Sequence, residues 1–376
     1  LPEAGSEEAN RLNKDIARHV KARFCLNEGT HYKYHDELEY ASEAEKWLQM
    51  AATESDKLIT SGRYEIYNTG HPQEDYFNMY RIDDKSDLKE AVLYVDYKTN
   101  ILEHNMAAAG REAGCGFSKS FVESFLCSDG LPISLSNKYL GDETMRKETA
   151  NRDPRLKQLI LTNDFPTNVT DDLKDSTFVV NEDEFITQHC FTGYRPIKGF
   201  NPIYSQALYM KSSFDGIAYR YAETLLINAE AKAELNTITN ADLDRTVNQL
   251  RDRVGMPHLT VNVGFTDPKW PDWGYSLSPI LQEIRRERCI ELAGEGFRFN
   301  DLKRWKAGKV LNNVLTYVGK RKPDGNLAIV YPNYTNPDLS YQAGKSRTWE
   351  DKMYLYPIPT GELQRNPQLL PQNPGW

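Results

Sequence analysis

Carboxylates and arginines occur at helical spacing in the last third of the sequence, where they could exchange protons or form ion pairs. Glu287 and Glu291 are four residues apart and therefore share one face of a helix. Arg288 directly follows Glu287, points in another direction and needs a partner elsewhere in the chain. We predict that these two glutamates, like Glu223 and Glu230 on an earlier helix, stabilise the scaffold through ion pairs and are not acid–base catalysts.

No established catalytic or metal-binding motif stands out in the sequence. It lacks a Gly-x-Ser-x-Gly nucleophile elbow, a Walker loop and a Gly-x-Gly-x-x-Gly loop. His31 and His35 have the spacing of two ligands on one helix face, but they follow Gly29 in an expected loop. The acidic run 83–87 is followed by Leu88, where an EF-hand loop needs glycine. We therefore predict no catalytic residue, no metal and no cofactor.

Aromatic side chains are abundant, with 22 Tyr, 14 Phe and 6 Trp. Their planes can stack on the apolar faces of sugar rings, while Asn, Asp, Arg and Lys bind the hydroxyl groups. Rings in predicted helices, such as Trp47, Tyr221 and Trp305, are expected to pack in the core. Rings in loops are better candidates for ligand contact. The predicted ligand-binding residues are Phe191, Tyr194, Phe200, Tyr204, Trp270, Trp273 and Tyr275.

The balance of charge argues against several classes of partner. The 376 residues include 46 Lys and Arg and 54 Asp and Glu, which gives a formal net charge of −8. An acidic chain without a basic run is poorly suited to bind the phosphates of nucleic acids. No stretch of the sequence approaches the roughly 18 consecutive apolar residues of a membrane span.

The cysteine pattern argues against a disulfide framework and against a zinc site. There are five cysteines, an odd number, and no two have Cys-x-x-Cys spacing. Cys25 and Cys289 fall in helical patterns, where we expect small buried hydrophobic side chains. Cys115 and Cys127 flank one predicted helix, and the sequence leaves their pairing open.

The first predicted secondary-structure element is a helix over 8–27. Leu12, Ile16, Val20 and Phe24 recur every four residues and predict its apolar face, with Gly29 as the stop.

A second helix is predicted over 42–60, with Ser42 and Glu45 forming a capping box and Gly62 ending the helix. The two helices should form an antiparallel hairpin.

The middle of the chain is less regular. Residues 91–97 predict a strand, and residues 117–126 predict a short helix. Residues 140–214 are rich in Asp, Asn, Thr and Pro, which indicates long loops with short strands and a few helical turns.

A second helical hairpin is predicted from apolar positions within 218–233 and 243–254, the latter helix being capped by Asn240. A further helix begins at residues 278–279, and Gly294 and its neighbours separate it from a last short helix.

These patterns predict a mostly α protein with a tetratricopeptide-like scaffold of helical hairpins and a loop-rich region carrying short strands. We divide the chain 1–376, taken as one domain, into a hairpin over 8–62, a loop-rich ligand region over about 63–214, and helical hairpins with C-terminal motifs over 215–376.

Several motifs in fixed order resemble those of one known family. Each is weak alone, but together they extend from residue 129 to the end of the chain. They are Asp-Gly-Leu-Pro-Ile at 129–133 with Asn-Arg-Asp-Pro-Arg-Leu at 151–156, Arg-Tyr-Ala-Glu at 220–223, Asn-x-x-Arg-x-Arg-x-Gly at 248–255, Arg-x-Glu-Arg-x-x-Glu-Leu-x-x-Glu-Gly-x-Arg-Phe-x-Asp-Leu-x-Arg-Trp at 285–305, Tyr-Pro-Ile-Pro-x-x-Glu-x-x-x-Asn-Pro at 356–367 and Gln-Asn-Pro-Gly-Trp at 372–376.

The series resembles the SusD/RagB family of surface-exposed, lipid-anchored nutrient-binding proteins of Bacteroidota. The resemblance implies a repeat scaffold, no enzymatic activity, and capture of a glycan or oligosaccharide at the outer face of the outer membrane. It also implies delivery of that ligand to a SusC-like TonB-dependent transporter. In the family a signal peptide, a lipidated cysteine and a helical portion precede the region that resembles Glu8 onward. We therefore expect this sequence to lack an N-terminal portion that carries the lipid anchor.

Two other functions stay open at this point. RagB-like members of the family are associated with peptide uptake, and the aromatic loops could serve a peptide as well as a sugar. A secreted glycoside hydrolase is the less favoured alternative, because the many carboxylates could include a catalytic pair.

Overall fold

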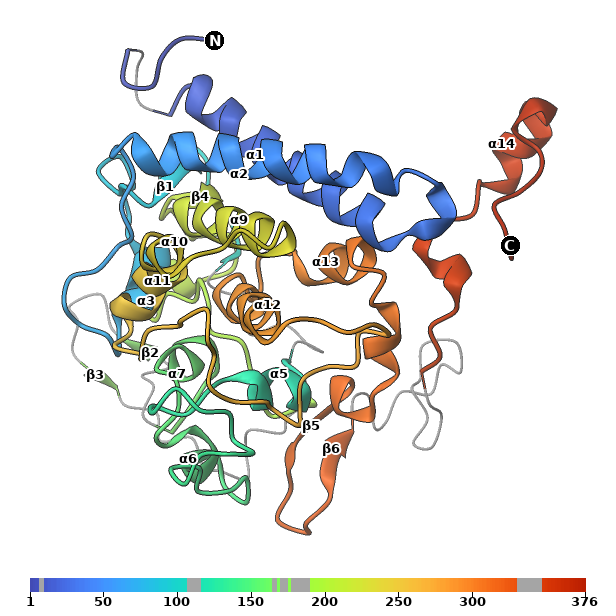
Figure 1. The fold of residues 1–376 in the computed structure, drawn as a ribbon. Helices are drawn as coiled ribbons and strands as arrows, with labels where there is room; N and C mark the ends of the chain where they lie inside the picture. Colours follow the sequence, from blue (N-terminus) through green and yellow to red (C-terminus); the bar gives the residue numbers. More distant parts are fainter. Residues whose placement is uncertain (7–9, 107–115, 164–167, 170–174, 177–189, 330–346) are drawn as a thin grey trace.

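The computed structural model describes residues 1–6, 10–106, 116–163, 168–169, 175–176, 190–329 and 347–376. Within these ranges the protein is mostly helical, with three two-stranded antiparallel sheets. The long helices α1 and α2 form the upper layer of Figure 1, helices α9 and α12 lie below them, and short helices and loops fill the lower part. The predicted mostly α fold with a loop-rich region is confirmed.

The α-helices are α1 (Lys14–Tyr34), α2 (Ala41–Thr60), α3 (Asp75–Asn78), α5 (Lys119–Ser124), α6 (Met145–Thr149), α7 (Arg155–Leu159), α8 (Tyr204–Ala207), α9 (Tyr221–Glu234), α10 (Asn240–Asp244), α11 (Val247–Arg253), α12 (Pro279–Glu291), α13 (Arg298–Arg304) and α14 (Thr360–Arg365). The strands are β1 (Ala91–Val95), β2 (Asn168–Val169), β3 (Asp175–Ser176), β4 (Gly216–Arg220), β5 (Val318–Arg321) and β6 (Leu327–Ile329). Short 3-10 helices are η1 (Asp36–Leu38), η2 (Met79–Arg81), η4 (Gly308–Asn312), η5 (Val314–Thr316), η6 (Asp351–Tyr354) and η7 (Pro367–Leu369).

Helix α1 is displaced from the predicted range 8–27: it begins at Lys14, does not stop at Gly29 and ends at Tyr34. It begins after Asn13, whose side chain accepts hydrogen bonds from the backbone N–H groups of Asp15 and Ile16. Gly29 lies inside the helix at the crossing with α2, where a Cβ atom would be 2.8 Å from Cγ of Leu48. The glycine therefore serves close helix packing, and its helix-ending tendency is overridden by the tertiary contact.

The predicted apolar face of α1 is also corrected. Ile16 is buried, but Leu12, Val20 and Phe24 are exposed. A strict four-residue repeat advances about 40° around the helix at each step, because an α-helix has 3.6 residues per turn. The face that packs against α2 and α9 carries Ala22 and other small or apolar side chains instead.

Helix α2 begins at Ala41, and its N-cap Tyr40 makes no side-chain capping hydrogen bond. The predicted capping box of Ser42 and Glu45 is therefore not formed. Gly62 follows the helix with φ of +66°, as expected for a residue that ends it.

Strand β1 lies within the predicted strand 91–97 and pairs antiparallel with β4. Strand β4 includes Ala218, which the apolar pattern had assigned to the following helix; the chain instead turns from strand to helix at Arg220–Tyr221. Helix α9 is buried along almost its whole length between the α1–α2 hairpin and α12. It is the central element of the scaffold.

The predicted helix 243–254 is in fact two short helices, α10 and α11, separated at Thr246. The N-cap of α10 is Thr239, which forms a capping box with Asp242, and Asn240 is the first helical residue. The break leaves Leu243 and Val247 buried against α9, so the core contact survives the change of direction.

Helix α12 begins as predicted, since the Ser278 hydroxyl accepts a hydrogen bond from the backbone N–H of Leu281. It ends at Glu291, and Gly294 follows with φ of +74°. Helix α13 then carries Leu302 into a small core with Trp305.

None of the described helices is both long and apolar enough to cross a membrane. Cys25, Cys127 and Cys190 are buried free thiols, and Cys289 is a half-buried one. Cys115 lies outside the described residues.

Candidate functional site

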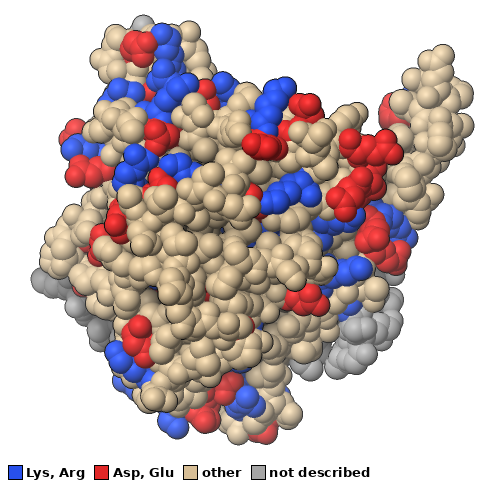
Figure 2. Space-filling view, viewed as in Figure 1, with Lys and Arg blue, Asp and Glu red and all other residues tan. Residues whose placement is uncertain are grey.

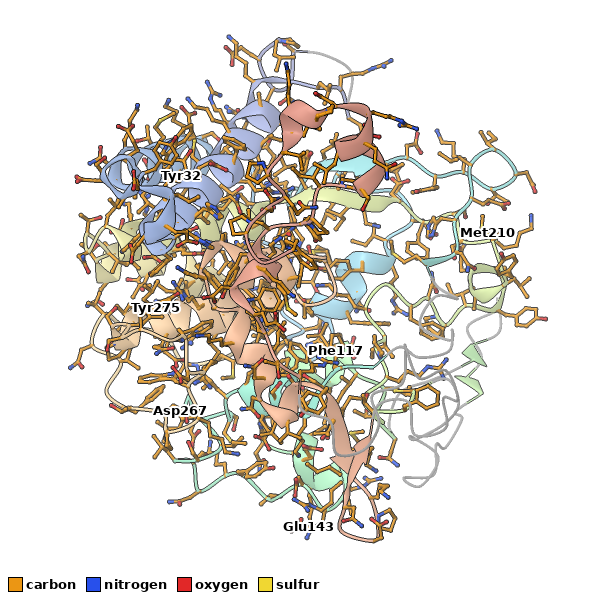
Figure 3. All side chains as sticks on the ribbon, turned by 90° about the vertical axis from the view of Figure 1, so that its right-hand side faces the viewer. Tyr32, Phe117, Glu143, Met210, Asp267 and Tyr275 are labelled. Atoms are coloured by element: carbon orange, nitrogen blue, oxygen red, sulfur yellow. The ribbon has the colours of Figure 1, made fainter. Side chains whose placement is uncertain are left out.

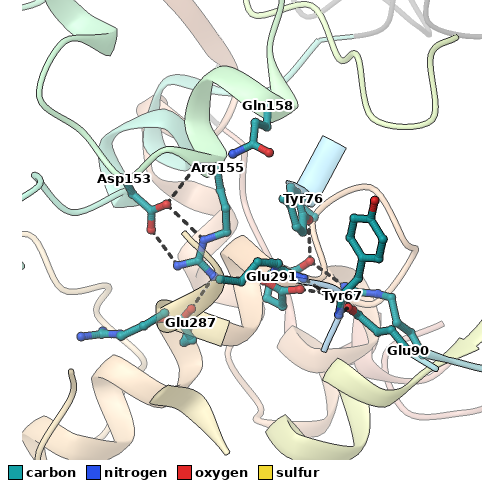
Figure 4. Close-up of polar contacts among 12 residues, drawn as sticks. Tyr67, Tyr76, Glu90, Asp153, Arg155, Gln158, Glu287 and Glu291 are labelled. Carbon is teal, nitrogen blue, oxygen red and sulfur yellow. Dashed lines mark hydrogen bonds and ion pairs between the residues drawn. The ribbon is translucent and has the colours of Figure 1, made fainter. Parts of the chain in front are cut away.

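A buried cluster of charges joins the middle of the chain to α12. At its centre Arg155 donates from Nη1 to Glu287 and, at 3.1 Å, to Oε2 of Glu291, and from Nη2 to Oδ2 of Asp153 at 2.6 Å (Figure 4). These contacts place both glutamates on one helix face in scaffold ion pairs, as their spacing predicts.

Glu291 is also bound from its other side. Arg220 and Arg253 each donate to it at 2.6 Å, and Arg220 donates to Glu90 at 2.8 Å. Burial alone would raise the pKa of Glu291, but Arg253, Arg220 and Arg155 together hold it well below its usual range. A carboxylate so bound is neither a proton donor nor accessible to substrate, which fits a structural role.

Beside this cluster a cavity of about 1150 Å³ opens between α1, β4, α13 and residues 354–356. Its walls combine aromatic rings with charged and amide side chains. The rings are Phe24, Tyr80, Phe117, Phe297, Tyr354 and Tyr356. In Figure 3 Phe117 lies near the middle of the view, where the C-terminal part of the chain passes in front of the body.

Lys198 and Glu295 form the floor of the cavity. Lys198 Nζ lies 2.6 Å from Oε1 of Glu295 and also donates to the Tyr76 hydroxyl at 2.8 Å and the Ala293 carbonyl at 2.7 Å. Burial lowers the pKa of Lys198 to about 8, against the opposing effect of Glu295. Glu295 accepts a further hydrogen bond of 2.6 Å from Arg220, so the floor is linked to the buried cluster.

Helix α1 supplies one wall. Arg23 Nε donates to Oε1 of Glu223 at 2.6 Å, and His19 Nε2 lies 2.9 Å from the other oxygen of that carboxylate. Burial opposes ionisation of Glu223, yet His19 and Arg23 lower its pKa to about 2. Next to Arg23, Phe24 is 55% exposed and lines the cavity, and its ring contacts Trp47 edge to face at 5.9 Å.

Helix α13, which packs against α1, and the C-terminal segment supply a further part of the lining. The Lys303 ammonium lies 4.2 Å from the centroid of the Tyr356 ring, which is 70% exposed. Asp301 on the same helix binds Arg288 and Arg304, each at 2.9 Å. Arg288 thus finds the distant partner that its position in the sequence requires.

His31 and His35 stack with ring centroids 4.1 Å apart, and both lie on α1 or at its end rather than in the predicted loop. Burial lowers the pKa of His31 to about 4, so the ring that lines the cavity is neutral at neutral pH. No group of three or more metal-binding side chains is found among the described residues.

None of the seven ring residues predicted from the sequence lines this cavity. Tyr194 and Phe200 are buried in one hydrophobic cluster, and the Tyr194 hydroxyl donates to Glu148 at 2.8 Å. A buried ring has no free face, so these two positions support the core and not a ligand.

The aromatic loop before α12 is also turned inward. Trp273 is only 4% exposed and contacts Trp305 edge to face at 5.6 Å. Tyr275 stacks on Tyr34 at 4.6 Å and donates to the Trp305 carbonyl at 2.5 Å. Trp270 is half-buried, and its Nε1 donates to Glu283 at 2.7 Å.

The last two predicted rings are more accessible. Phe191 is half-buried, and Tyr204, the first residue of α8, is 59% exposed. Tyr204 alone among the seven presents an open ring, and it lies outside the cavity lining.

The rings that line the cavity were not among the ligand-binding residues predicted from the sequence. Phe24 was placed on the core side of α1, and Tyr356 was noted only as part of a motif. The exact four-residue spacing from Leu12 to Phe24 could have indicated this. Side chains four residues apart rotate about 40° around the helix at each step, so the row of side chains turns away from the core.

The helical scaffold thus carries a large groove lined by aromatic and charged side chains. The chain belongs to the SusD family, whose model matches residues 53–376. The SusD-like protein P2 of Formosa agariphila is 32% identical over 166 residues, which cover 44% of this chain and 27% of that relative.

Two solved structures from Bacteroides fragilis share the fold. A SusD-like protein aligns with 24% identity and a TM-score of 0.67, over 100% of this chain and 67% of the other. A SusD-like carbohydrate-binding protein aligns with 23% identity and a TM-score of 0.63, over 98% of this chain and 66% of the other. This chain thus spans about two thirds of the length of these relatives.

Proposed function

We propose that this protein binds glycans or oligosaccharides at the outer face of the bacterial outer membrane, where a lipid anchor holds it. It passes them to a SusC-like TonB-dependent transporter, and it does not catalyse a reaction on them. Membership of the SusD family supports the class, and the carbohydrate-binding relative in Bacteroides fragilis supports the ligand.

The cavity is the observation that carries this proposal. Its volume of about 1150 Å³ exceeds that of most small-molecule pockets and leaves room for several sugar rings. Exposed rings such as Phe24 and Tyr356 offer stacking surfaces, and Asn27 and Asn300 offer amide groups to hydroxyls.

Two buried glutamates bear on the alternative of a hydrolase. Burial raises the pKa of Glu148 and of Glu283, the direction that a general acid needs. Each is nevertheless almost fully enclosed, Glu148 by Lys119 and Tyr194 and Glu283 by Trp270. A substrate cannot reach either carboxyl group in this arrangement.

Calorimetric titration with a panel of polysaccharides, oligosaccharides and peptide digests tests the proposal, with product analysis after incubation. We expect saccharide binding without hydrolysis, weakened about fivefold or more by Phe24→Ala through loss of one stacking contact. Binding of peptides alone would move the protein to peptide uptake, and turnover of a glycan would make it a hydrolase. Recovery of a TonB-dependent transporter with the tagged protein from solubilised outer membranes tests the delivery step.

A further inference from the structure

The cavity differs in charge from the rest of the chain. The protein carries a formal net charge of −8, yet the described cavity lining has six cationic side chains against four carboxylates. Carboxylates outside the lining reduce this excess, because Glu291 pairs with Arg220 and Glu230 pairs with Arg304. The six cations are Arg23, Lys198, Arg220, Arg288, Lys303 and Arg304.

Most of these cations are already bound to carboxylates. Arg23 is paired with Glu223, and Lys198 and Arg220 are paired with Glu295. Such pairs offer little further attraction to a ligand, since their charges are matched within the protein.

Lys303 is different, because its ammonium group makes no ion pair with any carboxylate in the described part of the chain. Its contacts are with rings: Tyr356 at 4.2 Å and Phe299 at 5.8 Å from the centroids. Burial lowers the pKa of Lys303, so this cation is incompletely solvated. An anion bound beside it would restore the lost stabilisation.

Arg288 also lines the cavity, but it is buried and its charge is paired with Asp301. Nη1 of Arg288 is buried and has no hydrogen-bond partner among the residues that the structure describes, although Nε of Arg288 binds Asp301. The His31 ring, which also lines the cavity, is neutral at neutral pH and adds no charge of its own. Lys303 is therefore the lining cation that no described carboxylate neutralises, and it lies beside the exposed Tyr356 ring.

We propose that the cavity selects acidic glycans, which carry carboxylate or sulfate groups, and that Lys303 binds the acidic group while the Tyr356 ring stacks on the sugar. This inference rests on the proposed glycan-binding function and names the substrate class of that same site. Carboxylate and sulfate share the chemistry that the site recognises, a negative charge with several acceptor oxygens.

Matched ligand pairs test this selection with the full-length mature protein. Oligogalacturonate is compared with its methyl ester for carboxylates, and dextran sulfate with dextran for sulfates. We expect the charged member of at least one pair to bind at least tenfold more tightly at 0.15 M salt. The difference should shrink as salt rises, because screening weakens an exposed charge contact.

Variants assign the effect to one side chain. Lys303→Gln should abolish the preference for the charged ligand, whereas Lys303→Arg should retain it. Lys309→Gln is the matched control, because Lys309 is an exposed lysine of η4 outside the cavity lining. Thermal unfolding of each variant shows that it is folded.

The outcomes separate this inference from the function on which it rests. Equal binding of charged and neutral ligands, or an unchanged preference in Lys303→Gln, overturns the inference but leaves glycan binding intact. Binding of no saccharide removes the proposed function as well.

Discussion

Gly29 of α1 lies directly against Leu48 of α2, so closely that a side chain on the glycine would overlap the leucine. A Cβ built at Gly29 would be 2.8 Å from Leu48 Cγ and 3.0 Å from the Leu48 backbone nitrogen. The first hairpin of the scaffold therefore depends on the absence of a side chain at one position.

Gly29→Ala should destabilise the protein by about 1–3 kcal/mol, because the added methyl group must displace α2. Urea unfolding measures the change in the free energy of unfolding. Gly361→Ala in α14 is the matched control, since a Cβ there meets no atom within 4 Å. It should be neutral or slightly stabilising, and a loss equal to that of Gly29→Ala would contradict the packing argument.

Glu291→Gln should cost about 3–5 kcal/mol of stability. The change removes the negative charge that Arg155, Arg220 and Arg253 share in the buried cluster (Figure 4). Guanidinium unfolding measures the loss. The same change at Glu362, whose pair with Arg365 is exposed, should alter stability by less than about 0.5 kcal/mol.

Acid should weaken the contact between α1 and α9 through Glu223. Its pKa falls from an ordinary 4.5 to about 2 in the folded protein, so folding favours the ionised form. The resulting stability, about 3 kcal/mol, is present above pH 4.5 and is lost as the pH falls towards 2. Unfolding curves between pH 7 and pH 3 should show a shallower decline for Glu223→Gln than for the unaltered protein. Parallel declines would show that Glu223 does not contribute.

Trp273→Ala should cost about 3–5 kcal/mol, because this ring is enclosed beside Trp305 and Arg285. Tyr204→Ala should change stability by less than about 0.5 kcal/mol, since the Tyr204 ring is mostly exposed. Thermal unfolding of both variants compares the two predicted ligand residues directly. Equal losses would show that exposure does not separate them.

The arrangement of charge on the surface is consistent with the absence of a basic run in the sequence. Figure 2 shows Lys and Arg interspersed with Asp and Glu on the face that it presents, above all over α1 and α2. This face offers no broad patch of one sign to a polyanion.

The sequence alone determined the features that depend on near neighbours in the chain. The helical face shared by Glu287 and Glu291, the start of α12 at residues 278–279 and the helix end at Gly62 follow from local sequence signals, and the structure has all of them. The order of motifs likewise identified the family, which the match over residues 53–376 confirms.

The tertiary structure decided which side of each element is covered and which charges meet. Gly29 lies within a helix because α2 packs closely against it there. Trp273 is buried because the fold brings Trp305 into contact with it. The meeting of Lys303 with Tyr356 joins α13 to a segment much later in the chain. Local periodicity cannot specify such contacts, because burial and charge pairing depend on how distant segments pack.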